Sequence, residues 1–210
     1  GPDLPPPRLD ARRRRVSEPD AVVAVLSNGV ARHPIAAYEA ALDNLSRLPV
    51  DEQRSLERMF QQATKLIART LSVERVGIWL YEQGRTQLRL ACQYNRTRDA
   101  YRADDVIRES DYPVYFHALQ DYRAIVADDA RTHPLTSELT ASYLVPNGIT
   151  SMLDAPLLRH GEVVGVVCHE HVGDLRTWTP SETNFVASVA DLVALAMEQA
   201  AHIEARRALE

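Results

Sequence analysis

Cysteine is scarce in this sequence: the 210 residues include two, Cys92 and Cys168. Two thiols cannot form a disulfide framework or a closed four-thiolate zinc site, and such rarity is typical of the reducing cytoplasm. No run approaches the ~18 consecutive apolar residues of a membrane-spanning helix, so we expect no membrane insertion. The net charge of −5, from 24 basic and 29 acidic residues, does not favour nucleic-acid binding. We therefore expect a cytoplasmic protein without a nucleic-acid partner.

Motifs of catalysis are also missing. The sequence has no Gly-rich phosphate-binding loop, no nucleophile elbow around a serine and no metalloprotease helix. It does have 45% hydrophobic and 25% charged residues, which suffice for the core of one ordinary globular domain. We therefore expect a non-enzymatic domain, and we assign no catalytic and no metal-binding residue.

The first fifty residues divide into two parts. Residues 1–16 are rich in arginine and proline, which predicts a disordered, solvated tail. An arm that binds nucleic acid or anionic lipid is the alternative. Residues 17–50 are expected to form a helical extension, because Ser-Glu-Pro-Asp at 17–20 is a helix-start signal and a second helical pattern spans 36–48.

Residues 51–205 have the pattern of one α+β domain. A helix begins at Asp51, and a long helix spans 180–207. Between them the apolar period changes to two, which is typical of strands. Strands are expected at 75–81, 88–94, 124–127, 149–158 and 162–171, short helices at 113–120 and 136–144, and a polar irregular stretch at 95–111. This order predicts a central antiparallel sheet flanked by helices.

Three segments carry a resemblance to a known family. They are "RVGIWLYEQGRTQLRLACQYN" (75–95), "YFHALQDYRAIVADDARTHPLTSEL" (115–139) and, most specifically, "YLVPNGITSMLDAPLLRHGEVVGVVCHEH" (143–171). The chain over 52–203 resembles a GAF domain, the small-molecule sensory module of bacterial signalling proteins. It is similar to GAF domains found upstream of histidine kinases and diguanylate cyclases, and more distantly to phytochrome GAF domains.

The resemblance implies a fold, a role and a partner. The fold is a central antiparallel sheet of five to six strands, with the long N- and C-terminal helices on one face and the short helices and loops on the other. The role is sensing a small molecule in two-component or cyclic di-GMP signalling. Phytochrome GAF domains attach a bilin through a loop cysteine, whereas both cysteines here are mid-strand, so no covalent bilin is expected and the cofactor is unknown.

The two faces of the predicted sheet differ in chemistry. A three-residue turn centred on His160-Gly161 would place Thr150, Met152 and Asp154 on one face together with Val166, Cys168 and Glu170. Unpartnered buried carboxylates cost several kcal/mol, so they must be hydrogen-bonded, protonated or in contact with water. One interpretation is that both acids face a ligand cavity. The other is that each pairs with a backbone amide or an arginine, such as Arg123.

Aromatic residues are expected to cover this acidic face. Rings with hydroxyl groups suit a flat or amphipathic ligand, although they also fill ordinary cores. The candidate ligand-binding residues are Trp79, Tyr115, Tyr122, Tyr143, Thr150, Met152, Asp154, Cys168 and Glu170.

Four further hypotheses remain open. His169 and His171 share a strand face and could bind a metal, although surface or hydrogen-bonding histidines are commoner. The chain could instead be an enzyme of the methionine sulfoxide reductase type, although two strand-borne cysteines do not match that family's loop cysteines. It could also be a purely structural dimerisation module. The heptad-spaced residues Val186, Val189, Val193, Ala196, Ala200 and Ile203 predict a homodimer through the N- and C-terminal helices, unless they face the sheet.

Overall fold

The computed structural model describes residues 34–51 and 53–210, so the predicted tail at 1–16 and the helix start at 17–20 lie outside the described residues. The elements are α1 (Pro34–Ser46), α2 (Gln53–Leu71), β1 (Arg75–Tyr81), β2 (Gln87–Asn95), β3 (Ala100–Arg102), β4 (Val106–Arg108), α3 (Pro113–Asp121), β5 (Ile125–Ala127), the short helical turns η2 (Ser137–Leu139) and η3 (Thr140–Leu144), β6 (Ile149–Arg159), β7 (Glu162–Val172) and α4 (Pro180–Arg207). This is the expected α+β order.

The strands form one antiparallel sheet in the order β3-β2-β1-β7-β6-β5, with β4 also paired to β2. The sheet has seven strands rather than five or six. The expectation of an irregular stretch at 95–111 was wrong, because β3 and β4 lie within it. These strands are three residues each and mostly exposed, so they leave no apolar alternation in the sequence.

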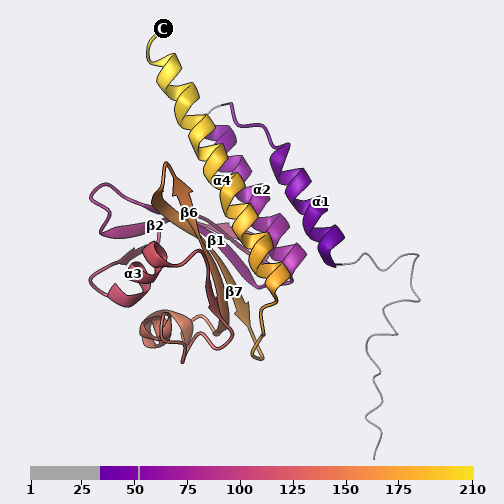
Figure 1. The fold of residues 1–210 in the computed structure, drawn as a ribbon, viewed down its shortest axis with the longest axis vertical. Coiled ribbons are helices and arrows are strands. Elements are labelled where there is room, and N and C mark those ends of the chain that lie inside the picture. Colours follow the sequence, from indigo (N-terminus) through magenta and orange to yellow (C-terminus); the bar gives the residue numbers. More distant parts are fainter. Residues whose placement is uncertain (1–33, 52) are drawn as a thin grey trace, which may run out of the picture. The chain divides into compact units, whose positions relative to one another are not determined.

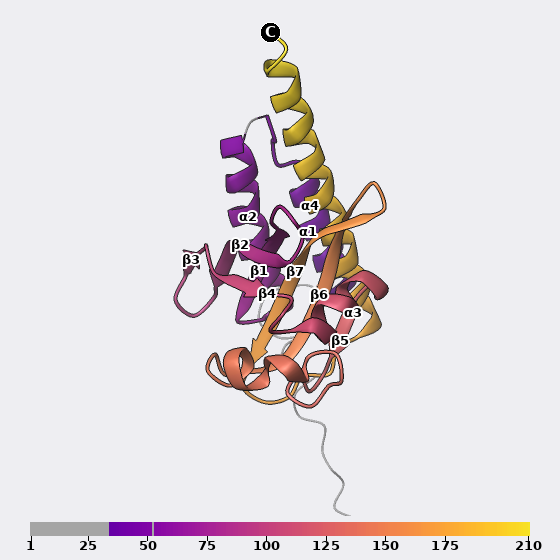
Figure 2. The ribbon, with the colours of Figure 1, turned by 90° about the vertical axis from the view of Figure 1, so that its left-hand side faces the viewer.

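Helices cover the two faces of the sheet unequally. Figures 1 and 2 show α1, α2 and α4 on one side of the sheet and α3 with the short turns on the other, as expected. The start of α4 is fixed by a capping box, in which Thr179 Oγ1 accepts from the Glu182 amide at 3.2 Å and Glu182 Oε2 accepts from the Thr179 amide at 2.8 Å.

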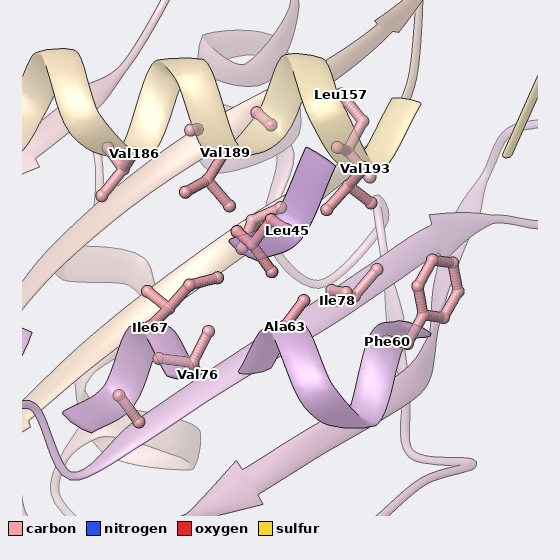
Figure 3. Close-up of a cluster of buried hydrophobic side chains, with 14 of the residues drawn as sticks. Leu45, Phe60, Ala63, Ile67, Val76, Ile78, Leu157, Val186, Val189 and Val193 are labelled. Atoms are coloured by element: carbon pink, nitrogen blue, oxygen red, sulfur yellow. The ribbon is translucent and has the colours of Figure 1, made fainter. Parts of the chain in front are cut away.

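The helix side of the sheet is a continuous apolar core. Leu45 of α1, Ile67 of α2, Val76 of β1 and Leu157 of β6 meet α4 there, as Figure 3 shows. Five of the heptad-spaced residues of α4 are buried in this core, namely Val186, Val189, Val193, Ala196 and Ala200, and only Ile203 is partly exposed. The predicted dimer seam is therefore mostly the core face of α4.

The same burial bears on membrane insertion. Among the described residues, α4 is long and apolar enough to cross a membrane by length and composition. Its buried side chains, however, pack on the sheet and on α1 and α2. We attribute its apolar character to that core packing.

The other side of the sheet carries a second apolar core. It lies beneath residues 113–121 and 137–147, which include α3, η2 and η3 and which we call the roof. Tyr115, Phe116 and Leu144 of the roof pack there against Trp79 and Met152 of the sheet. The sheet thus separates two independent cores.

The β6–β7 hairpin sets which residues face the roof. His160 and Gly161 form a two-residue turn with φ of 51° and 80°, not the expected three-residue turn. An irregularity beside Leu157 and Leu158 compensates, so that Asp154 pairs with Cys168 and Met152 with Glu170. Residues paired directly opposite one another share a face, so the predicted face assignment of these four residues is correct.

Candidate functional site

Two carboxylates lie on the roof side of the sheet and are both buried. Asp154 is 0% exposed and Glu170 is 1% exposed. Their place follows from the pleat, since Asp154 alternates with Leu153 and Ala155, and Glu170 with His169, which pairs with Leu153 on the helix side. The site is therefore defined by how these two acids are partnered.

Asp154 is only half satisfied. Its Oδ2 accepts a hydrogen bond from the Tyr115 hydroxyl of α3 at 2.6 Å, and the same hydroxyl lies 3.6 Å from Cys168 Sγ. Its Oδ1 makes no hydrogen bond of ordinary geometry within the described residues. Burial raises the pKa of Asp154 from 3.8 to about 7, because the charged form is desolvated. Asp154 is therefore a carboxyl group that gains and loses its proton near neutral pH.

Glu170 is fully engaged, by contrast. Its Oε2 accepts from Arg75 Nε at 2.7 Å, and its Oε1 accepts from the Tyr143 hydroxyl of η3. Arg75 Nη1 in turn donates to Asn147 Oδ1 at 2.9 Å. The alternative of an arginine partner is thus correct in kind for Glu170, but the partner is Arg75 of β1, and the candidate Arg123 is exposed.

The space beneath the roof is almost filled. A residual cavity of about 10 Å³ remains between the roof and the sheet. It is lined by Trp79, Ile107, Tyr115, Leu139, Tyr143, Met152, Cys168 and Glu170. Such a volume holds about one water-sized sphere at most, so a larger ligand enters only if the roof moves.

The structure brings most of the candidate residues together. Trp79, Tyr115, Tyr143, Met152, Cys168 and Glu170 line the cavity, and Asp154 contacts it through Tyr115. Whether they bind a ligand stays a prediction.

Two candidate residues lie elsewhere. Tyr122 follows α3 and is 49% exposed. Thr150 falls at a register shift between Ile149 and Ser151. Because of this shift, Ile149 rather than Thr150 packs in the core beneath the roof. The Thr150 hydroxyl instead donates to the His171 carbonyl oxygen at 3.3 Å. Both are corrections to the predicted site.

Sequence reasoning missed Arg75 and Asn147, which hold Glu170 in place. Arg75 stands at the start of the first strand and pairs with Glu170 across β1 and β7. The contact between Arg75 and Glu170 could have been predicted only from the pairing of these two strands, which are far apart in the sequence. Ile107 of β4 was missed because that strand was not expected.

His169 and Cys168 of β7 face opposite sides of the sheet. His169 lies on the helix side, where its Nδ1 is 2.6 Å from the Leu153 carbonyl oxygen, and burial lowers its pKa to about 4. Among the described residues, no group of three or more His, Cys, Asp or Glu is placed to hold a metal ion. Cys168, under the roof, has a pKa raised well above its usual value by burial, so it is a thiol rather than a thiolate.

Comparisons with known proteins agree with this geometry. A model of the GAF domain matches residues 55–197. The fold is similar to free methionine-R-sulfoxide reductase from Neisseria meningitidis in complex with its substrate, with a TM-score of 0.65, 16% identity and coverage of 83% of this chain and 96% of that one. A search of curated proteins found no match.

Two signalling domains are equally similar. The phycocyanobilin-bound GAF domain from a cyanobacterial phytochrome has a TM-score of 0.64 and 17% identity, over 83% of this chain and 98% of that one. A methyl-accepting chemotaxis protein fragment has a TM-score of 0.64 and 18% identity, over 79% and 99%. At these identities the likenesses show the fold alone.

Proposed function

Because the chain belongs to the GAF domain family, we propose that it is a sensory domain that binds a small molecule between the sheet and the roof. The sensory role is supported by its structural likeness to GAF domains of signalling proteins. The location is supported by the chemistry of the roof side, which combines aromatic rings with two buried acids.

The observation that carries this proposal is Asp154 Oδ1, which accepts no hydrogen bond of ordinary geometry within the described residues. A buried polar atom without a hydrogen bond costs about 1–3 kcal/mol, and folded cores contain few of them. A ligand that donates an N–H or O–H group to Oδ1 of the ionised carboxylate recovers that loss. Its apolar or aromatic body then contacts Trp79, Tyr115 and Tyr143, which line the adjoining cavity. We therefore propose an amphipathic ligand with a hydrogen-bond donor at one end.

Ligand binding in this scheme requires a second arrangement of the roof. The cavity of about 10 Å³ makes the described arrangement the closed one. Tyr115 and Tyr143 tie the roof to Asp154 and Glu170 of the sheet, so a ligand that replaces one of these hydrogen bonds changes how the roof is held. It shifts the population of the two arrangements only by its differential affinity for them.

Output is proposed to pass through a cytoplasmic homodimer of the N- and C-terminal helices, in which α4 and the first long helix, α2, make the contact. The core packing of the heptad-spaced residues leaves another face of α4 for this contact. Leu195 is half exposed on that helix, and Ile203 is partly exposed near its end. Sedimentation of the full chain tests the contact, since Leu195→Glu is expected to dissociate the dimer and the control Gln83→Glu, exposed in the β1–β2 turn, is not.

A thermal-shift screen of nucleotides, amino acids, purines and aromatic metabolites tests the site itself. A true ligand is expected to raise the melting temperature of the wild type and of Tyr122→Ala, which removes an exposed tyrosine next to the roof. It is expected to lose that effect in Asp154→Asn and in Tyr143→Ala. A compound that stabilises all four proteins equally binds somewhere else, and this location would then be wrong.

Two other functions have one observation each in their favour. The nearly filled cavity favours a purely structural dimerisation module, and a screen without any stabilising compound would support it. The likeness to a methionine-R-sulfoxide reductase favours an enzyme. The raised pKa of the buried Cys168 opposes nucleophilic chemistry there, so we expect no reduction of free methionine sulfoxide by the wild type.

A further inference from the structure

A larger pocket adjoins the closed cavity on the roof side of the sheet. This outer pocket has a volume of about 480 Å³, which is within the usual range for small-molecule sites. Arg75 and Asn147 line the outer pocket, whereas Glu170 and Tyr143 line the closed cavity. The hydrogen bonds among these four residues therefore form a partition between the two spaces.

Two buried groups that line the outer pocket lack partners. Gln93 of β2 is 0% exposed, and neither its Nε2 nor its Oε1 makes a hydrogen bond within the described residues. Arg75 Nη2 is likewise buried and unpartnered, although the other guanidinium nitrogens bond to Glu170 and Asn147. An amide with both atoms unsatisfied is costly in a core and needs a reason, such as a ligand.

The unpartnered N–H donors that line the outer pocket suit an oxyanion. Arg75 Nη2 is a charged N–H donor and Gln93 Nε2 is a neutral one, and oxygens of a carboxylate or phosphate accept from both. Arg98 adds positive charge at the rim, whereas Arg102 is paired with Asp105 and Glu74 adds one negative charge. Glu74 is occupied by Thr97, whose hydroxyl donates to it at 2.8 Å. The unpartnered donors, rather than the net charge of the pocket, therefore favour an anion.

We propose that the outer pocket binds a small molecule through a carboxylate or phosphate group, held by Arg75 Nη2 and the Gln93 amide. Gln93 Oε1 then accepts a hydrogen bond from a hydroxyl or N–H group of the same molecule. This site is separate from the one proposed beneath the roof and stands without it, because the outer pocket that its residues line already has the volume of a small-molecule site.

The experiment titrates inorganic phosphate and acetate, in separate arms, into the full-length chain against sodium chloride of equal ionic strength. Isothermal calorimetry measures affinity, and NMR of the glutamine side-chain amides reports on Gln93 itself. We expect at least one of the two anions to bind and to shift the Gln93 amide signal. If phosphate alone binds, the ligand group is a phosphate, and if acetate alone binds, it is a carboxylate.

Two variants make the test specific. Gln93→Leu removes both unsatisfied atoms, so we expect a higher melting temperature. We also expect the affinity for the anion to fall at least about tenfold, because a hydrogen bond to a charged group is lost. Arg98→Gln changes an exposed rim residue, which guards against a folding defect, and is expected to weaken binding several-fold. Gln199→Leu, on the exposed surface of α4, is the control and is expected to change neither quantity.

The proposal is overturned by either of two results. One is that neither anion binds more tightly than chloride does. The other is that Gln93→Leu is folded and binds with wild-type affinity, because the amide would then be an unsatisfied group of the fold and not part of a site.

Discussion

The protonation of Asp154 makes the stability of the protein depend on pH in a distinctive way. The pKa of this carboxyl is about 7 in the folded chain against the usual 3.8. Between these values the folded state keeps a proton that the unfolded state releases, so the free energy of unfolding falls as pH rises. The stabilising effect is complete below about pH 4 and is lost as pH rises through about 7. A rise of about three pKa units corresponds to about 4 kcal/mol.

His169 works in the opposite direction. Its pKa is about 4 in the folded chain against the usual 6.5. The unfolded state therefore binds more protons between these values, and stability rises with pH there. The two effects partly cancel in the wild type, so the wild-type curve alone does not isolate Asp154.

The difference between the wild type and Asp154→Asn does isolate it. Asparagine keeps the shape of the side chain and an acceptor for Tyr115, but it carries no charge at any pH. We expect the variant to become more stable relative to the wild type by about 4 kcal/mol as the pH rises from about 4 to about 8. Urea unfolding at several pH values measures this difference. A control, Asp111→Asn, changes an exposed aspartate at the edge of the roof and is expected to show no such trend. A difference for Asp154→Asn that is flat with pH would refute the inference that a neutral acid lies beneath the roof.

Two further substitutions test the packing around the site. Glu170→Gln leaves the charge of Arg75 buried without a carboxylate, so urea unfolding is expected to show a loss of stability of about 3–5 kcal/mol. The exposed control Glu162→Gln should cost less than about 0.5 kcal/mol. Equal losses for the two variants would contradict a buried ion pair. Gly165→Ala would place a Cβ 2.2 Å from a backbone oxygen of β1 and is expected to cost about 3 kcal/mol or more by the same assay. Gly77→Ala meets its nearest atoms at 3.3 Å, all in side chains, and should cost about 1 kcal/mol, so similar effects would refute the close approach of β7 to β1.

The two faces of the sheet could be predicted from the sequence because a strand alternates strictly. Once 149–158 and 162–171 were assigned as strands, Asp154 had to share a face with Met152 and oppose Leu153. The turn at His160-Gly161 was predicted one residue too long, and a compensating irregularity restored the register. The same kind of irregularity was not predictable at Thr150, and there the assignment failed.

Contacts between segments far apart in the sequence account for most of the features that could not be predicted. The partner of Glu170 depends on β1 lying next to β7, a contact between segments about a hundred residues apart, whereas local spacing pointed to Arg123. The volume beneath the roof depends on how side chains of several elements interlock, which no spacing rule gives. The heptad spacing of α4 was ambiguous because a stripe facing a sheet and a stripe facing a second helix look alike in sequence.

Cys168 offers the most direct measurement of whether the roof opens, because it is buried beneath the roof at the cavity wall. In a Cys92→Ala variant it is the only thiol, and its rate of labelling by a thiol reagent gives the free energy of the opening that exposes it. Urea unfolding of the same protein gives the free energy of global unfolding. If the roof opens while the helix side of the sheet stays folded, the labelling free energy is clearly smaller than the global one and hardly changes at low urea. If the two free energies and their urea slopes are equal, Cys168 is exposed only by complete unfolding, and a ligand site that opens beneath the roof is contradicted.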